Sequence, residues 1–264
     1  MRGVSAATLE EVLAAVEGSG TSDIGDELFS VTALLDATPS LRRILTDPAT
    51  EPDARVGLLK QVLGDKVSTG TLAILTVAAN GRWASSRDLT DGLEISGVAA
   101  HVAAAEKDGQ LEAMESELFD VGNIVVADSD LRAALTDRTT AASAKAELVN
   151  SIFEGKVTAP TVALVRQAAA ARTASFEKVL ATFADEVADR RNRLLAEVRS
   201  TYPLTDAELD RIAAALAKRY DREFHLNTVI DPDLVGGIRV SVGGDVIDGS
   251  VSSRLEDARR LIAG

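Results

Sequence analysis

Apolar residues recur at steps of three and four along the first two thirds of the chain, with polar and charged residues between them. This spacing places the apolar side chains on one face of an α-helix. The clearest stripe lies in residues 111–127 and consists of Leu111, Met114, Leu118, Val121, Ile124 and Val125. The same pattern predicts helices over residues 139–153, 158–171 and 174–193. We therefore expect residues 1–193 to be helical.

Three stretches of this region return later in the chain at one fixed distance. The pairs are ELFSV and ELFDV, LRRILTD and LRAALTD, and DKVSTGTLAIL and GKVTAPTVALV, whose members lie 90 residues apart. Independent helical patterning does not keep one offset over three separate stretches, so the pairs indicate an internal duplication. We assign residues 1–95 to an extra N-terminal copy and residues 96–193 to a second copy. Residues 86–105 lack proline and are predicted to form a long helix that joins the copies, with Gly109 as its stop.

The periodicity changes in the last part of the chain, which predicts a third domain over residues 194–264. Residues 206–220 keep a helical stripe, and Thr205 with Glu208 forms a capping box at its start. The stretches LLAEVRSTYPL, FHLNTVID and IRVSV read as strands, the last two by alternating apolar and polar residues. The predicted fold class is mostly α with a small α+β C-terminal domain: two repeated helical bundles followed by a small mixed domain with a β-hairpin.

Two glycine pairs stand in the C-terminal stretch VIDPDLVGGIRVSVGGDVIDGSV. A dinucleotide-binding loop needs three spaced glycines between a strand and a helix. Here Gly236-Gly237 and Gly243-Gly244 are adjacent pairs on either side of an alternating strand, and Gly243-Gly244-Asp245 is typical of a hairpin turn. We therefore predict turns in this stretch and no phosphate-binding site.

Composition argues against several kinds of chemistry. The 264 residues carry a formal net charge of −13, which disfavours nucleic acids and anionic lipid surfaces as partners. Cysteine is absent, and the two histidines, His101 and His225, are far apart, so we predict no thiol nucleophile and no metal site. Each histidine is expected to be solvated or hydrogen-bonded rather than a ligand. The sequence has no nucleotide-binding or hydrolase motif and no apolar run of membrane-spanning length. We predict no catalytic residues and no cofactor.

The helix predicted over residues 158–171 is apolar on nearly every side. Its apolar residues include Val162, Leu164, Val165, Ala168 and Ala169. Such a helix is either buried at the centre of a bundle or forms one wall of a groove that receives a partner helix. The sequence leaves both interpretations open.

The glycine-containing stretch carries a family resemblance, which extends from Leu226 to the last helix. The residues that form the matching motif are Asp231, Leu234, Gly236, Gly237, Ile238, Val240, Gly244, Asp245, Asp248, Gly249, Ser250, Arg254 and Leu255. This pattern resembles the C-terminal part of the ATP synthase delta subunit family, which includes the oligomycin-sensitivity-conferring protein. The helices of residues 96–193 look like the family's N-terminal bundle. Residues 1–95 depart from the family's pattern and look like the extension of long actinobacterial delta subunits.

The resemblance implies a non-catalytic subunit of the peripheral stalk, or stator, of the F-type proton-translocating ATP synthase. It implies that a helical bundle binds the N-terminal segment of an alpha subunit and that the C-terminal domain meets the b subunit. The protein would lie at the cytoplasmic face of the cell membrane without spanning it. The apolar helix then becomes a candidate wall of the alpha-subunit groove, lined by Val162, Val165 and Ala169. Which copy binds alpha stays open.

Two other classes of function remain as alternatives. A free-standing helical adaptor would not co-purify with the alpha and b subunits. An enzyme using dispersed carboxylates would need a carboxylate pair with perturbed pKa values in a pocket, whereas the carboxylates of this chain are scattered along helix faces.

Overall fold

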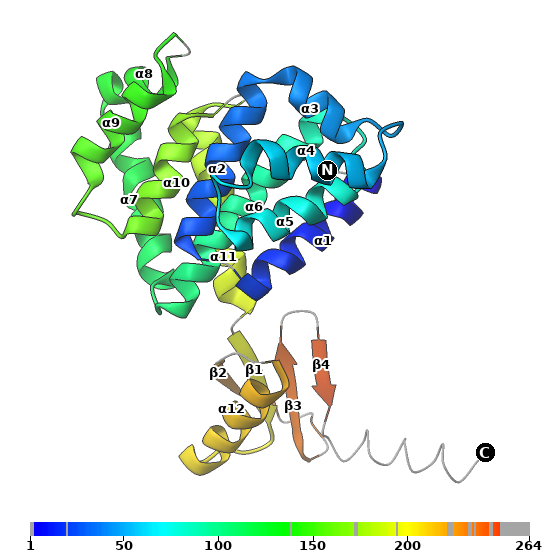
Figure 1. Ribbon diagram of the computed structural model, residues 1–264. Helices are drawn as coiled ribbons and strands as arrows, with labels where there is room; N and C mark the ends of the chain where they lie inside the picture. The colour runs from blue at the N-terminus through cyan, green and yellow to red at the C-terminus, as the bar shows by residue number, and fades with distance from the viewer. Residues whose placement is uncertain are drawn as a thin grey trace. The chain divides into compact units, whose positions relative to one another are not determined.

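The computed structural model describes residues 3–19, 21–137, 139–171, 174–193, 195–220, 224–231, 234, 236–242 and 245–248. Their contacts divide the chain into two compact units, Met1–Val187 and Ala188–Gly264 (Figure 1). The first unit is helical and the second contains a sheet, so the predicted fold class is confirmed.

The described residues of the helical region form eleven α-helices. The first copy contains α1 (Val4–Ser19), α2 (Ser22–Ala37), α3 (Pro39–Thr46), α4 (Pro52–Leu63) and α5 (Thr69–Asn80). The remaining helices are α6 (Ser86–Lys107), α7 (Leu111–Ala127), α8 (Ser129–Thr136), α9 (Ala142–Phe153), α10 (Ala159–Ala169) and α11 (Phe176–Arg193).

The duplication is visible in the positions of these helices. Adding 90 to the bounds of α3 and α4 gives those of α8 and α9, and α5 and α10 also begin 90 residues apart. The start of α6 corresponds to the start of α11, while the later part of α6 corresponds to α1. One helix therefore serves both copies, as the last helix of the first and the first helix of the second. The predicted domain boundary at 95/96 lies inside this shared helix, and the division into three domains stays a prediction.

A pair of glutamates repeats one capping contact in both copies. Glu27 on α2 accepts hydrogen bonds from the backbone nitrogen and the hydroxyl of Ser68, at 2.8 to 3.0 Å, at the start of α5. Glu117 on α7 accepts the same two bonds from Thr158 at the start of α10, at 2.7 to 3.0 Å, and a third from Thr161. A carboxylate at a helix N-terminus satisfies free N–H groups and complements the helix dipole. The Glu of the repeated ELF motif thus joins the second helix of each copy to the fifth.

The shared helix α6 has a cap at each end. Ser85 and Asp88 bond reciprocally, with Asp88 N donating to Ser85 Oγ at 3.2 Å and Ser85 Oγ donating to Asp88 Oδ1 at 2.7 Å. Ser5 of α1 also donates to Asp88, at 2.5 Å. The helix ends before Gly109, whose φ of +66° is the left-handed conformation that stops helices. The predicted long helix and its stop are confirmed.

The start of α9 differs from the sequence prediction. The sequence predicts a helix over residues 139–153, but α9 begins at Ala142. Asp137 accepts hydrogen bonds from Thr139 N and from the hydroxyls of Thr139 and Thr140, all at 2.8 to 2.9 Å. These side-chain bonds hold the segment as a turn, because they compete with helical backbone bonds.

The second unit contains a four-stranded sheet and one described helix. In chain order these are β1 (Leu195–Ser200), α12 (Asp206–Tyr220), β2 (His225–Ile230), β3 (Ile238–Val242) and β4 (Asp245–Asp248). The sheet order is β2-β1-β3-β4, with β1 parallel to β2 and antiparallel to β3. The predicted hairpin is confirmed by the antiparallel β3–β4 pair. Leu216 of α12 packs in a core with Ala196, Val198, Val240 and Val242 from the sheet.

Candidate functional site

The motif of the C-terminal region surrounds the connection between β2 and β3. Asp231 follows β2; its backbone N–H donates to Ser200 O at 2.9 Å, and its carboxylate lies 3.6 Å from Arg199 Nη1. Gly236 and Gly237 have φ values of +72° and +86°, a region that side chains rarely adopt, which explains why glycines stand there. These residues shape the turn into β3, in agreement with the prediction that the glycines make turns.

Other motif residues belong to the hairpin or lie beyond the described part. Asp245 pairs with Val242 at the hairpin, and Asp248 pairs with Arg239. Five motif residues are outside the described residues: Gly244, Gly249, Ser250, Arg254 and Leu255. The predicted last helix and the Gly243-Gly244 turn are outside them as well. The motif's role therefore stays a prediction.

The predicted groove residues lie on α10. Val162, Val165 and Ala169 are 7%, 0% and 2% exposed. Helix α10 contacts α6, α7 and α9 of the second copy and also α2 of the first copy. Because these three side chains are buried, α10 receives a partner helix at this wall only if neighbouring helices move apart. The groove assignment stays a prediction.

Helix α2 crosses α6 at very short range. A Cβ atom added at Gly25 would lie 2.5 Å from the His101 ring, and one added at Gly97 would lie 2.6 Å from the Phe29 ring. The rings of Phe29 and His101 stack with centroids 5.3 Å apart and planes inclined by 28°. Glycine at both positions of the crossing is required because any side chain would force the helices apart.

The same helix also reaches α10. Asp26 Oδ1 of α2 lies 3.4 Å from Arg166 Nη2 on α10 and 3.6 Å from His101 Nε2 on α6. Figure 1 shows α2 running alongside α6 and α10. A helix of the first copy is therefore seated across two helices of the second. The apolar periodicity does not predict this helix crossing. The isolated glycines Gly25 and Gly97 inside helices are the sequence feature that could have indicated it.

Burial controls the charge state at this crossing. His101 is 1% exposed, and burial, together with the positive charge of Arg166, lowers its pKa to about 4. The imidazole is therefore neutral near pH 7. Burial raises the pKa of Asp26, although Arg166 acts in the opposite direction. The expectation for His101 was wrong: it is not solvated, and neither ring nitrogen has a hydrogen-bond partner within the described part of the chain. The face of the imidazole stacks on Phe29, while its two ring nitrogens stay without a hydrogen bond within the described residues.

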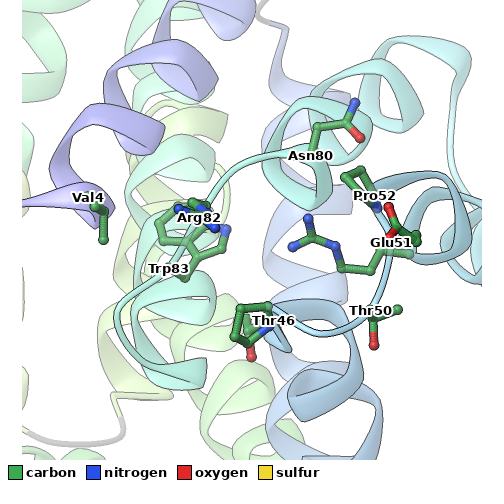
Figure 2. A pocket seen from close by; sticks show the side chains of 10 residues that line it. Val4, Thr46, Thr50, Glu51, Pro52, Asn80, Arg82 and Trp83 are labelled. Atoms are coloured by element: carbon green, nitrogen blue, oxygen red, sulfur yellow. The ribbon is translucent and has the colours of Figure 1, made fainter.

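A pocket of about 570 Å³ opens in the first copy. Figure 2 shows Trp83 and Arg82 on one side of it and Thr50, Glu51 and Pro52 on the other. Arg55 also lines the pocket; it is 5% exposed and donates to Gly81 O at 3.2 Å and to Leu45 O at 3.5 Å. These carbonyls lie at the ends of α5 and α3, where a cation is favoured.

The second copy has a buried cation at the same place. Lys145 lies 90 residues after Arg55, is 7% exposed, and has a pKa lowered by burial. A buried cation at one position of both copies fits a role in joining helices. In the described ranges, no three acidic or histidine side chains gather as a metal site, and no helix is long and apolar enough to cross a membrane.

Comparison with known proteins identifies the chain. The family model described as ATP synthase delta (OSCP) subunit matches residues 98–262. ATP synthase subunit delta of Kineococcus radiotolerans is 42% identical over 255 residues, covering 96% of this chain and 92% of that protein. The Streptomyces avermitilis protein of the same name is 43% identical, with 97% and 96% covered. That of Thermobifida fusca is 40% identical over the full length of both chains.

A solved mitochondrial ATP synthase from Toxoplasma gondii contains a chain that matches 63% of this one. Its sequence identity of 21% and TM-score of 0.33 are too low to transfer any geometry.

A helical region built from two repeats and followed by a small α+β region places the protein in the mostly α class. Within that class, the chain belongs to the ATP synthase delta (OSCP) subunit family. It is a non-catalytic component of the peripheral stalk of the F-type ATP synthase. The match of all three relatives to more than 90% of the chain extends to the duplicated first copy, beyond the region of the family model.

Proposed function

We propose that the helical unit binds the N-terminal segment of an alpha subunit, that the C-terminal region binds the b subunit, and that the complex lies at the cytoplasmic face of the cell membrane. The observation that carries this proposal is the packing of α2 across α6 and α10, because it shows that two helices of this fold can bind a third helix. An alpha segment that forms an amphipathic helix would be bound by the same kind of surface.

A stator needs stiffness and complementary surfaces rather than reacting groups. The first copy supplies a dense core, in which Leu28, Leu35, Ile74, Leu75 and Leu93 are no more than 1% exposed. Close-packed cores have low compressibility and transmit strain. A bundle with such a core can bear the torque of the rotor without deforming. The head would then stay still while the rotor turns, and the torque would drive ATP formation in the head.

Calorimetric titration tests the alpha contact. The full-length chain is titrated with a synthetic peptide of the alpha subunit's N-terminal segment, and a peptide of scrambled order is the control. We expect saturable one-to-one binding of the natural peptide and no heat from the scrambled one. A folded chain that binds neither peptide would overturn the alpha contact and favour the free-standing adaptor.

Co-purification tests the b contact. The full-length chain is mixed with the soluble part of the b subunit and passed over a sizing column. We expect the two to elute together, and separate elution at concentrations of tens of micromolar would contradict the proposal.

A further inference from the structure

Arg55 of α4 is a buried cation that lacks a counter-ion within the described residues. Its side chain donates two hydrogen bonds, both from Nη1, to the carbonyls of Leu45 and Gly81. Its Nε atom has no hydrogen-bond partner in the described part of the chain, and the ion pairs found there do not include Arg55. Burying a charge is costly unless the charge is paired, so an anion is missing beside this guanidinium.

The second copy shows how the equivalent charge is balanced. Lys145 occupies the equivalent position, and the negative charge of Asp137 acts on it. Asp47 is the equivalent of Asp137 in the first copy, but no ion pair joins it to Arg55 among the described residues. Both copies therefore bury a cation at this position, and within the described residues only the second copy brings a carboxylate to it.

The pocket of about 570 Å³ in the first copy is lined by Arg55. Arg82 and Asn80, both exposed, bring a second cation and an amide to the same pocket. In Figure 2, Arg82 lies beside Trp83, and Glu51 lies on the other side of the pocket. Glu51 is the one carboxylate among the lining residues. Two arginines and one glutamate leave the lining with a net charge of +1.

The rest of the lining is largely apolar. Val4, Pro48, Pro52 and Trp83 contribute apolar surface. Trp83 is held in place because its Nε1 donates to Ala78 O at 2.8 Å. A cavity with apolar walls and a few convergent polar groups is the usual form of a small-molecule site.

Charge and shape indicate which anion fits. A carboxylate carries one negative charge, and its two oxygens match the planar donors of a guanidinium. A phosphate group brings about two negative charges, which exceeds the net charge of +1 on the lining. The lining therefore favours a carboxylate over a phosphate.

We propose that this pocket binds a small monocarboxylate with an apolar body. Arg55, Arg82 and Asn80 hold the carboxylate, and the apolar body lies against Trp83. The bound carboxylate is the counter-ion that Arg55 lacks. The carboxylate belongs either to a free organic acid or to the C-terminus of a peptide chain, which offers the same chemistry. The proposal goes beyond the stator role and does not depend on the alpha and b contacts.

Trp83 reports on the site directly, because it lines the pocket and is the chain's one tryptophan. The full-length chain is titrated with N-acetyl-leucine, which has one carboxylate and an apolar side chain. N-acetyl-leucinamide, which has the same body without the charge, is the control ligand. We expect a saturable change of Trp83 emission with the acid, with a dissociation constant in the millimolar range or below, and no saturable change with the amide.

Substitutions at exposed lining residues test the location while the fold is retained. Arg82→Gln and Asn80→Ala each remove a donor and should weaken binding of the acid at least about threefold. Glu51→Gln removes the repelling carboxylate and should strengthen binding. Arg132→Gln, at an exposed position of α8 in the second copy, is the matched control and should leave the affinity unchanged.

Arg55 itself is tested by the residue of the second copy. Arg55→Lys keeps the charge that the helix ends favour but removes the planar fork, so the chain should fold and bind the acid more weakly. Circular dichroism checks that the helices are retained.

Ligand length separates the two sources of the carboxylate. Tighter binding of an acetylated tetrapeptide that ends in leucine with a free carboxylate supports a peptide C-terminus as the ligand. Tighter or equal binding of N-acetyl-leucine supports a free organic acid. The proposal is overturned if neither acid gives a saturable response, if acid and amide respond alike, or if Arg82→Gln, Asn80→Ala and Glu51→Gln all bind like the unaltered chain.

Discussion

A histidine buried without a hydrogen bond is the most unusual residue of the helical unit. His101 carries no proton near pH 7 because burial and Arg166 lower its pKa to about 4. In the unfolded chain its pKa would be near 6.5. Between these two values the unfolded chain binds a proton that the folded chain does not, so stability is present above about pH 6.5 and is lost as pH falls toward 4.

This linkage predicts a pH dependence that one substitution removes. From pH 7 to pH 4.5, the free energy of unfolding of the unaltered chain should fall by about 2 to 3 kcal/mol more than that of His101→Leu. Asp26 and Arg166 face the ring and remain in both proteins, as does His225. Urea unfolding followed by fluorescence of Trp83, which is the one tryptophan and lies in the first unit, measures the difference. Equal pH slopes in the two proteins would contradict the assignment.

At the scale of helices, the two capping glutamates, Glu27 and Glu117, are repeated in the sequence and stabilise the same helix start in each copy. Removing Glu117 leaves the start of α10 without the acceptor for Thr158 and Thr161. Glu117→Ala should lower the free energy of unfolding by about 1 to 2 kcal/mol, and Glu27→Ala should act similarly in the first copy. Glu112→Ala, at an exposed position of the same helix as Glu117, is the control, and thermal unfolding measures all three. If the free energy of unfolding of Glu117→Ala falls no more than that of the control Glu112→Ala, Glu117 has no capping role.

Periodicity predicted helices well where one face is apolar. The bounds predicted for α7 and α12 are those observed, because 3.6-residue spacing and a capping residue determine them locally. It failed at the start of α9, where Asp137 holds Thr139 in a turn. The sequence of α10 is apolar on nearly every side. This pattern shows that the helix is covered but does not indicate which elements cover it. Only the three-dimensional arrangement shows that one neighbour is α2, from the other copy.

The candidate site was harder to predict than the fold. Equivalence between α1 and α6 follows from the 90-residue offset, which the sequence contains. The exposure of Ala7 and Glu11 on α1 does not follow from the sequence. A helix stripe of alanine and glutamate is as compatible with a packed face as with an open one. The difference in exposure between α1 and the equivalent part of α6 is known only from the structure, because α2 covers α6 and leaves α1 open.

At the scale of the whole helical unit, the shared helix α6 couples the copies. Leu93 of α6 is 1% exposed within the core of the first copy, and His101 of the same helix meets α2. Loosening one part of a continuous helix disturbs the packing along it, so the copies should open together. Neither copy has a complete set of helices without α6.

Leu93→Ala tests this coupling. The cavity should cost about 2 to 5 kcal/mol of unfolding free energy. Hydrogen exchange should quicken in α10 of the second copy as well as in α1 and α5 of the first. Leu164→Ala, at a fully buried position of α10, is the reciprocal variant and should quicken exchange in α5. Exchange changes restricted to the copy that carries each substitution would show that the copies are independent.

Duplicating a docking module ordinarily raises valence, and with it avidity, because a second binding event becomes intramolecular. The seat of α2 removes that gain here. Helix α2 of the same chain already covers α6 and α10, so the proposed function predicts that the duplicated unit binds one partner helix rather than two. The duplication then enlarges the packed body around one attachment point, because α6 is continuous through the cores of both copies.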